Sequence, residues 1–227
     1  TIYDQLNYNV RDERYYVRKD SLYGILRRDG SPFIPIEYTD ILSDGHYFKV
    51  QKDGKWGLLN MEAKEILPTC FQNIKDDIFL DNTLLQVADR WTVLRWVRAN
   101  PCTPSVSYQQ IDAFNEFFLV KDNNRWGLVD TANKEKLPTQ YLYLGPFFGK
   151  YLRTLLVVNT EKKMGLTRID STGALIEMLP LVYDEIWVDE QTLKIKVRQG
   201  KFRDYIYEGK PYLDLKYNDV TYYDRID

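Results

Sequence analysis

A short motif that returns at nearly constant spacing constrains this chain more than any other feature. Residues 52–60 read Lys-Asp-Gly-Lys-Trp-Gly-Leu-Leu-Asn, residues 121–130 repeat the pattern, and two degenerate copies lie elsewhere in the chain. The glycines that mark the four copies are Gly24, Gly57, Gly127 and Gly165. Their spacing corresponds to a unit of about 35 residues, a period typical of repeat architectures.

Two further markers run in phase with this motif. The first is an aromatic residue followed three positions later by an aliphatic one, at Tyr3/Leu6, Tyr38/Ile41, Phe71/Ile74, Tyr108/Ile111, Tyr141/Leu144, Tyr183/Ile186 and Tyr217/Val220. The second is a proline three residues before the aromatic one, at Pro35, Pro68, Pro138 and Pro180, and shifted by one at Pro104. Where the third and sixth units should carry Trp-Gly, we align Trp91-Thr92 and Phe202-Arg203.

The second copy shows the expected course of one unit. Residues 47–51 alternate like a strand, and Asp53-Gly54 is a strong signal for a two-residue hairpin turn. The Trp-Gly strand follows over 55–60, and its apolar residues on both faces predict a strand covered on both sides by neighbouring units. The glycine is expected to admit a close neighbour, because it has no Cβ. The proline predicts the end of a short apolar strand, since proline cannot donate a hydrogen bond within a sheet.

The pattern predicts an all-β fold of six to seven antiparallel β-hairpin repeats. The expected boundaries in this single domain, 1–227, are 1–35, 36–68, 69–104, 105–138, 139–180, 181–214 and a partial 215–227. An open solenoid or superhelical stack is favoured, because the two ends duplicate the same element instead of complementing each other. The alternative is a closed ring resembling a six-bladed β-propeller.

These residues resemble the WG-repeat (KWG-repeat) family, a bacterial family of β-repeat proteins. The resemblance rests on residues 54–58 and 125–130, and on the Leu-Pro-x-x-aromatic-x-x-aliphatic segments at 67–74 and 137–144. Only two units keep Trp-Gly intact, and the third and sixth lose the glycine. The resemblance implies an interaction scaffold and no particular reaction.

Composition narrows the classes of partner. The chain of 227 residues has 31 Lys+Arg and 33 Asp+Glu, for a net charge of −2. A near-neutral balance argues against a general nucleic-acid binder. No apolar run reaches the ~18 residues of a membrane helix, so we expect no membrane insertion. We expect a monomer in the cytoplasm, with a periplasmic or surface location after removal of a signal as the alternative.

The titratable residues do not form a recognisable catalytic or metal-binding pattern. The only cysteines are Cys70 and Cys102, which occupy different repeat positions, and we expect two free thiols. A lone histidine, His46, cannot form a typical zinc site. Acid pairs such as Asp184/Glu185 are expected by chance among so many acids. We therefore expect no catalytic residues, no metal, no cofactor and no enzymatic activity.

Two departures from the pattern are the candidate binding sites. Residues 90–98 carry two tryptophans and three arginines, residue types enriched at interface hot spots. We expect this segment to be a strand with Trp96 and Arg98 exposed; Arg90 and Arg95 complete the candidate set.

The second departure, residues 145–153, lengthens the fifth unit and concentrates aromatic residues in an expected surface link. An exposed apolar patch in such a place would mark a partner site. The candidates here are Phe147, Phe148, Tyr151 and Arg153.

The leading functional hypothesis is a non-enzymatic protein–protein interaction module, with an adaptor or toxin-neutralising (immunity-type) role within that class. A carbohydrate- or cell-wall-binding module is the alternative, because exposed Trp and Tyr side chains also bind sugars. A hydrolase is the weakest hypothesis.

Overall fold

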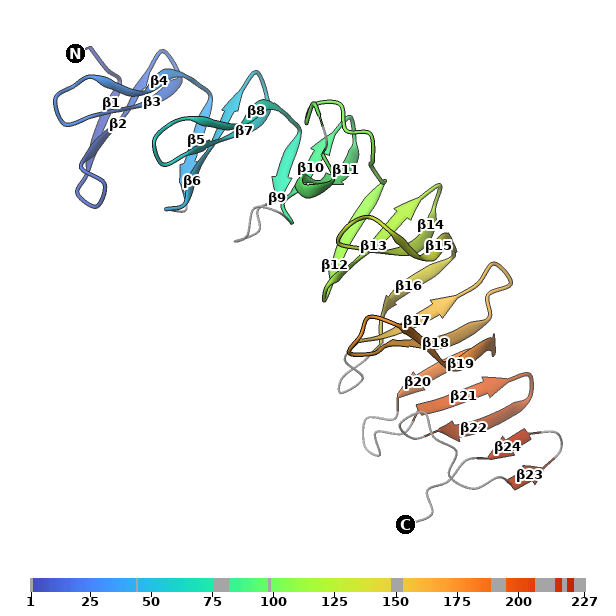
Figure 1. The fold of residues 1–227 in the computed structure, drawn as a ribbon. Helices are drawn as coiled ribbons and strands as arrows, with labels where there is room; N and C mark the ends of the chain where they lie inside the picture. Colours follow the sequence, from blue (N-terminus) through green and yellow to red (C-terminus); the bar gives the residue numbers. More distant parts are fainter. Residues whose placement is uncertain are drawn as a thin grey trace. The chain divides into compact units, whose positions relative to one another are not determined.

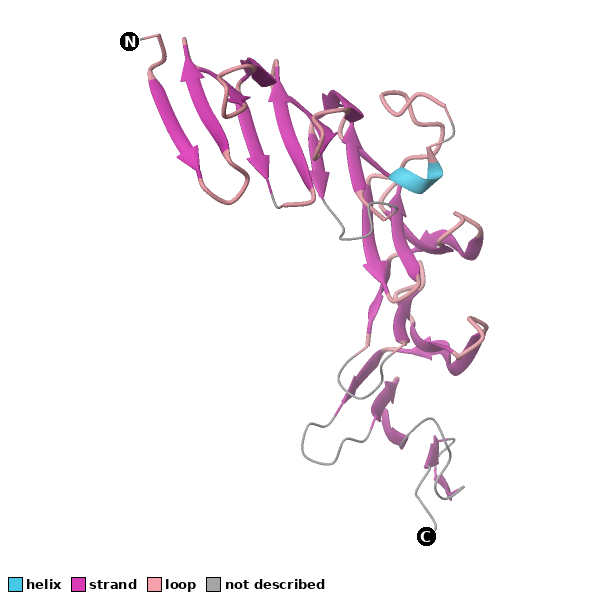
Figure 2. Ribbon diagram, turned by 60° about the vertical axis from the view of Figure 1, so that its left-hand side comes forward, coloured by secondary structure: helices cyan, strands magenta, loops and turns pink. Residues whose placement is uncertain are grey.

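The structure is a computed structural model of the chain. It describes residues 2–43, 45–75, 82–97, 99–147, 153–188, 195–206, 215–217 and 220–222, with side chains up to residue 201. Strands dominate, and the only helix among these residues is one 3₁₀ turn, η1 (Leu94–Trp96) (Figure 2). No helix in the described ranges has the length and apolar character to cross a membrane. The predicted all-β class is confirmed.

The chain divides into two compact units, Thr1–Tyr108 and Gln109–Asp227. The division falls inside the array of repeats that the sequence pattern treats as one domain. Each unit is a series of small antiparallel sheets, built in chain order (Figure 1).

Unit 1 contains three sheets. The first is β1 (Gln5–Asn9), β2 (Arg14–Lys19), β3 (Leu22–Leu26) and β4 (Pro32–Tyr38). The second is β5 (Asp40–Ser43), β6 (Tyr47–Lys52), β7 (Lys55–Asn60) and β8 (Glu65–Phe71). The third has only β9 (Asn73–Lys75), β10 (Leu84–Val87) and β11 (Arg90–Val93) in its described residues.

Unit 2 contains four sheets in the part of the chain that the structure describes. The fourth sheet of the chain is β12 (Gln110–Phe114), β13 (Phe117–Asp122), β14 (Arg125–Asp130) and β15 (Glu135–Tyr141). The fifth is β16 (Tyr143–Pro146), β17 (Thr154–Val158), β18 (Met164–Ile169) and β19 (Leu175–Tyr183). The sixth has β20 (Glu185–Val188), β21 (Ile195–Gln199) and β22 (Phe202–Ile206), and the seventh pairs β23 (Leu215–Tyr217) with β24 (Val220–Tyr222).

A complete repeat is therefore a four-stranded sheet, where the sequence predicts a hairpin with short flanking elements. The aromatic-x-x-aliphatic marker spans two sheets, since Tyr38 ends β4 and Ile41 lies in β5. Each of the four-stranded sheets consequently ends at the aromatic residue, three residues later than the proline that we expected to close the repeat.

The prediction that the proline marks a strand end is wrong. Pro68 lies inside β8, opposite the glycine of the Trp-Gly pair. Trp56 pairs with Phe71 and Leu58 pairs with Leu67, so residues 68–70 bulge out against Gly57. A bulge tolerates proline because its residues are not paired in the ladder.

The core lies between successive sheets. On β7, Leu58 packs with residues of the second and third sheets, whereas Leu59 packs with residues of the first and second. Equivalent clusters join the fourth sheet to the fifth and the fifth to the sixth. This confirms that the Trp-Gly strand is covered on both faces, as its apolar pattern predicts.

The sixth sheet corrects one alignment. Val197 pairs with Asp204 there, as Val50 pairs with Gly57 in the second sheet. Arg203 and Asp204 therefore stand at the Trp-Gly position, one residue later than the predicted Phe202-Arg203.

Candidate functional site

The third repeat replaces its fourth strand with a loop. Thr92 stands where the other sheets of unit 1 have glycine, and it is fully buried. A Cβ at the equivalent Gly57 would lie 2.7 Å from the Leu67 carbonyl oxygen, so a threonine leaves no room for a bulged strand there. Only the aromatic end of that strand persists, because Trp91 and Tyr108 exchange two backbone hydrogen bonds of 2.7 and 2.8 Å.

Between these points the chain leaves β11, makes the turn η1 and runs on as a loop; residues 99–107 are called the stapled loop below. A disulfide joins Cys70, in the bulge of β8, to Cys102, with the two Cα atoms 5.7 Å apart. The prediction of two free thiols is wrong. The two cysteines meet because one lies in a bulge and the other in the segment that replaces the next bulge.

A second tie holds the far end of the stapled loop. The Arg90 guanidinium donates to the Ser107 carbonyl oxygen at 2.6 Å and to its hydroxyl at 3.0 Å. The exposed residues of the loop are small: Ala99, Asn100, Thr103 and Ser105. The loop is thus anchored covalently near its middle and by charged hydrogen bonds at its end.

The first predicted site is only partly as expected. Trp96 is 5% exposed and its ring meets that of Tyr108 edge-on at 6.1 Å, so the prediction of an exposed Trp96 is wrong. The physical reason is η1, which ends the strand alternation after Val93 and turns Trp96 inward. Arg95 is half-buried on the same turn, and Arg98 lies outside the described residues.

The second predicted site also changes. Phe147 is 8% exposed and packs with Leu166 and Ile186, so it belongs to the core between the fifth and sixth sheets instead of an exposed patch. Arg153 donates to the carbonyl oxygens of Ile169 and Asp170 at 3.1 and 2.9 Å, and pairs with Glu116. Phe148 and Tyr151 lie outside the described residues, and their role in binding stays a prediction.

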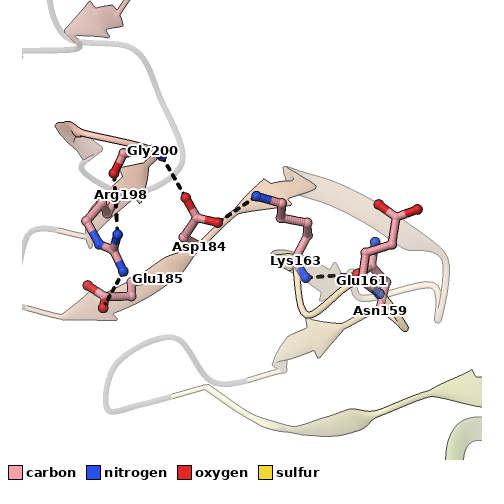
Figure 3. A network of polar contacts seen from close by, with 7 residues as sticks. All are labelled: Asn159, Glu161, Lys163, Asp184, Glu185, Arg198 and Gly200. Atoms are coloured by element: carbon pink, nitrogen blue, oxygen red, sulfur yellow. Dashed lines mark hydrogen bonds and ion pairs between the residues drawn. The ribbon is translucent and has the colours of Figure 1, made fainter.

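A polar network ties the fifth sheet to the sixth (Figure 3). The Lys163 ammonium meets Asp184 Oδ1 at 2.6 Å, and Asp184 Oδ2 accepts the Gly200 N–H at 2.6 Å. Beside it, Arg198 and Glu185 form an ion pair of 2.7 Å.

Electrostatics stabilises the charged forms of this network. The hydrogen bond from Lys163, followed by that from Gly200, holds the pKa of Asp184 below its ordinary value. The hydrogen bond to Glu185 raises the pKa of Arg198. Each carboxylate therefore has its own cation, an arrangement that fixes the junction between two sheets and differs from two acids facing each other across a cleft.

The four aromatic residues at Trp-Gly positions, Tyr23, Trp56, Trp91 and Trp126, each have a cation over the ring. Lys49 lies 5.1 Å from the Trp56 centroid, and Lys121 lies 5.5 Å from that of Trp126. The same arrangement occurs at Tyr23 with Arg18, at 5.7 Å, and at Trp91 with Lys75, at 4.5 Å. These half-buried rings support the repeats, consistent with the interpretation of the Trp-Gly motif as a structural element.

Among the described residues, no group of three or more His, Cys, Asp or Glu is placed to hold a metal ion. His46 is exposed at the start of the second hairpin. The feature that sequence reasoning missed is the stapled loop. Its signal was present in the loss of glycine at Thr92, followed ten residues later by a cysteine.

Comparison with known proteins supports the resemblance stated from the sequence. Residues 23–56 match the family model of the WG containing repeat. No curated protein matches the chain in sequence.

Several solved structures are similar to this chain at low TM-score. Hsv2 of Kluyveromyces lactis is 10% identical with a TM-score of 0.35, over 85% of this chain and 68% of that one. PorZ, a surface component of the type-IX secretion system of Porphyromonas gingivalis, is 9% identical with a TM-score of 0.29, over 90% of this chain and 32% of that one. The WD40 domain of Neurospora crassa Pan2 is 13% identical with a TM-score of 0.31, over 88% of this chain and 73% of that one.

Proposed function

We propose that this chain, which carries a WG-containing repeat, is a non-enzymatic module that binds another protein, with the stapled loop as the main contact. One observation carries the proposal. The third repeat gives up its fourth strand for a loop that is held by the Cys70–Cys102 disulfide and by Arg90. In folded domains, loops held by a rigid scaffold carry a disproportionate share of binding residues.

The physical basis is preorganisation. A loop that is already anchored at two points loses little conformational entropy when it meets a partner, so more of the contact energy appears as affinity. The exposed side chains of the loop are small, and those of Asn100, Thr103 and Ser105 are polar, which suits adaptable hydrogen bonding at an interface. Arg95, on the turn η1, is a basic residue four positions before the loop in the sequence.

Adaptor and toxin-neutralising roles make different demands within this class. An adaptor holds two partners at once, whereas a toxin-neutralising protein binds one partner in a stoichiometric complex that abolishes its activity. The stoichiometry of the captured complex distinguishes them.

The alternative of carbohydrate binding has less support. Sugar sites use flat aromatic faces that are open to solvent. Here the rings of Trp56, Trp91 and Trp126 are half-buried and each lies next to a lysine ammonium.

The test is affinity capture from a lysate of the source organism, with the wild-type chain and two matched variants. Thr103→Glu places a charge on the stapled loop, whereas Thr160→Glu places the same charge on an exposed turn between β17 and β18. We expect wild type and Thr160→Glu to retain the same protein and Thr103→Glu to lose at least about tenfold in affinity, as for a contact at the centre of an interface.

Equal capture by both variants would remove the stapled loop from the proposal. Retention of polysaccharide alone would overturn the protein-binding function itself.

A further inference from the structure

The Cys70–Cys102 bond joins two parts of unit 1 that are held in different ways. Cys70 lies in the bulge of β8, and Cys102 lies in the stapled loop. Both residues are half-buried, and Asn100 and Thr103 on either side of Cys102 are exposed. A disulfide that solvent can reach is open to attack by a thiolate, and bonds of this kind are the labile and regulatory ones.

The sheets beside the bond do not depend on it. β7 pairs with β8 on both sides of the bulge, and β10 pairs with β9 and β11. The core between the second and third sheets consists of buried apolar side chains, among them Leu58, Phe71 and Leu85, and Cys70 only borders it. Opening the bond therefore leaves the strand pairing and the apolar core of both sheets in place.

The stapled loop, in contrast, depends on the bond. In residues 99–106, the hydrogen bonds that the structure describes stay within the loop. The Asn100 side chain accepts the N–H of Cys102 at 2.9 Å, and the Asn100 carbonyl oxygen accepts the N–H of Thr103 at 3.2 Å. Arg90 holds only Ser107, at the end of the loop. The middle of the loop is thus tied to the second sheet by one covalent bond.

We infer that this disulfide is a redox switch: a dithiol reductant opens it and releases the stapled loop, while both sheets remain folded. A thiolate of the reductant attacks one sulfur of the Cys70–Cys102 bond, and the other sulfur leaves as a thiolate. The second thiol of the reductant then displaces the mixed disulfide and closes a disulfide within the reductant. Cys70 and Cys102 take the two electrons and two protons that the dithiol loses, and become thiols.

The state of the loop then follows the redox state of its surroundings. The loop is ordered where disulfides persist and is released where thiol reductants keep them open. The effect on binding rests on the proposed function. A released loop must lose conformational freedom again when it meets a partner, and this cost lowers the affinity.

Hydrogen exchange of the full chain, measured by mass spectrometry, tests the switch with reduced and oxidised dithiothreitol as the probe. Alkylation counts the free thiols in the same samples. We expect reduction to speed exchange in residues 99–106 at least about tenfold while β6, β7 and β10 keep their protection, and reoxidation to restore the slow rate. The matched control is Cys70→Ser/Cys102→Ser, whose loop should exchange fast in both buffers.

Three results overturn the inference. The first is loss of protection in β7 and β10 together with the loop, because the bond would then stabilise the fold as a whole. The second is unchanged exchange in residues 99–106 after both thiols have become free. The third is a bond that resists the probe until urea unfolds the chain.

A second measurement uses the protein that the oxidised chain captures. We expect the reduced chain and the double variant to bind it at least about tenfold more weakly than the oxidised chain does. Equal affinity in both redox states overturns the regulation of binding. An oxidised chain that captures no protein overturns the proposed function, while the exchange measurement still decides whether the loop is switched.

Discussion

At the scale of single residues, the glycine of the Trp-Gly pair decides whether a repeat can carry its fourth strand. The bulge of β8 brings backbone atoms of Leu67, Pro68 and Thr69 to within 2.7–2.9 Å of where a Cβ on Gly57 would lie. Gly127 meets β15 in the same way, with the Leu137 carbonyl oxygen at 2.9 Å. Backbone atoms cannot swing aside as a flexible side chain can, so the hydrogen of glycine is the substituent that fits.

Gly57→Ala should therefore destabilise the chain by about 2 kcal/mol, the usual cost of forcing a methyl group into a packed site. The measurement is urea unfolding followed by far-UV circular dichroism. Gly54→Asn in the same hairpin is the control, since its Cβ would meet nothing within 4 Å and asparagine tolerates the positive φ of +71°. If both substitutions lower the free energy of unfolding equally, the close approach of β8 is not the reason that position 57 requires glycine.

The residue scale is also where sequence reasoning succeeded best. The regular Trp-Gly pairs predicted a strand buried on both faces, and the absence of a Cβ predicted a close neighbour; both are confirmed at Gly57. The partner of that glycine was not predicted, because Pro68 suggested a strand end. A bulge depends on how two strands pair, which the residues of one strand do not reveal.

At the scale of elements, a recurrent polar turn connects the third strand of a repeat to the fourth. The side-chain oxygen of Asn60 accepts the N–H groups of Glu62 and Lys64 at 3.0 and 2.8 Å. Asp130 accepts those of Ala132 and Lys134 at 3.0 and 2.9 Å. An asparagine or aspartate in this position thus replaces the hydrogen bonds that a sheet would provide.

Asp130→Asn should keep this turn, because Asn60 performs the same task, whereas Asp130→Ala should cost about 1 kcal/mol, because the oxygen that accepts both N–H groups is lost. Thermal unfolding at pH 7 compares the three proteins. If Asp130→Asn lowers the Tm as much as Asp130→Ala does, the charge of the carboxylate, and not the acceptor oxygen, stabilises the turn.

Acid unfolding should separate wild type from Asp130→Asn. Partial burial works to raise the pKa of Asp130, but the N–H groups of Lys134 and Ala132 and the nearby Lys136 outweigh it and hold the pKa below its ordinary value. A carboxyl with a depressed pKa contributes stability that is present above about pH 4 and is lost as the pH falls through the folded-state pKa. Between about pH 5 and pH 2 the Tm of wild type should therefore fall more than that of Asp130→Asn. If the Tm of both proteins falls equally over this pH range, Asp130 does not have a depressed pKa in the folded state.

The stapled loop is the element that the sequence did not predict. Residues 90–98 suggested one continuous strand, and the two cysteines had no common repeat position. The turn η1 and the disulfide arise together, because Thr92 excludes the bulged strand and the freed segment then folds back to Cys70. That outcome depends on contacts between two repeats, so no periodic pattern within one repeat contains it.

Reduction of the Cys70–Cys102 bond should lower the free energy of unfolding by roughly 3–4 kcal/mol, the chain-entropy value for a loop of 32 residues. Thermal unfolding with and without a thiol reductant measures this, and limited proteolysis should then cut first between Ala99 and Ser105. The Cys70→Ser/Cys102→Ser double variant is the control and should not respond to reductant. A wild-type Tm that is indifferent to reductant would contradict the bond.

At the scale of the whole molecule, stability is distributed along the array. Each core cluster involves two successive sheets, and the four clusters belong wholly to one unit or the other. The polar network around Asp184 adds a second kind of tie within unit 2 (Figure 3). This is the energetics of repeat proteins, in which each unit depends on its nearest neighbours.

Calorimetry should consequently resolve two cooperative transitions. Leu166→Ala, at a fully buried position in unit 2, should lower the free energy of unfolding in one transition by about 3 kcal/mol. Leu58→Ala should lower the free energy of unfolding in the other transition by a similar amount. Isolated fragments 1–108 and 109–227 identify which transition belongs to which unit. A single transition that both substitutions shift together would show that the two units unfold as one.

The exchange of a strand for a loop in the third repeat has a consequence for how such arrays diversify. Trp56, Trp91 and Trp126 are evenly spaced at 35 residues, so the loop occupies a unit of ordinary length. Thr92 stands at the glycine position and is followed by η1 and the stapled loop, while the next sheet pairs Val120 with Gly127 as the second sheet pairs Val50 with Gly57. A repeat can therefore exchange a strand for a loop while its own length and the register of the following sheet are kept.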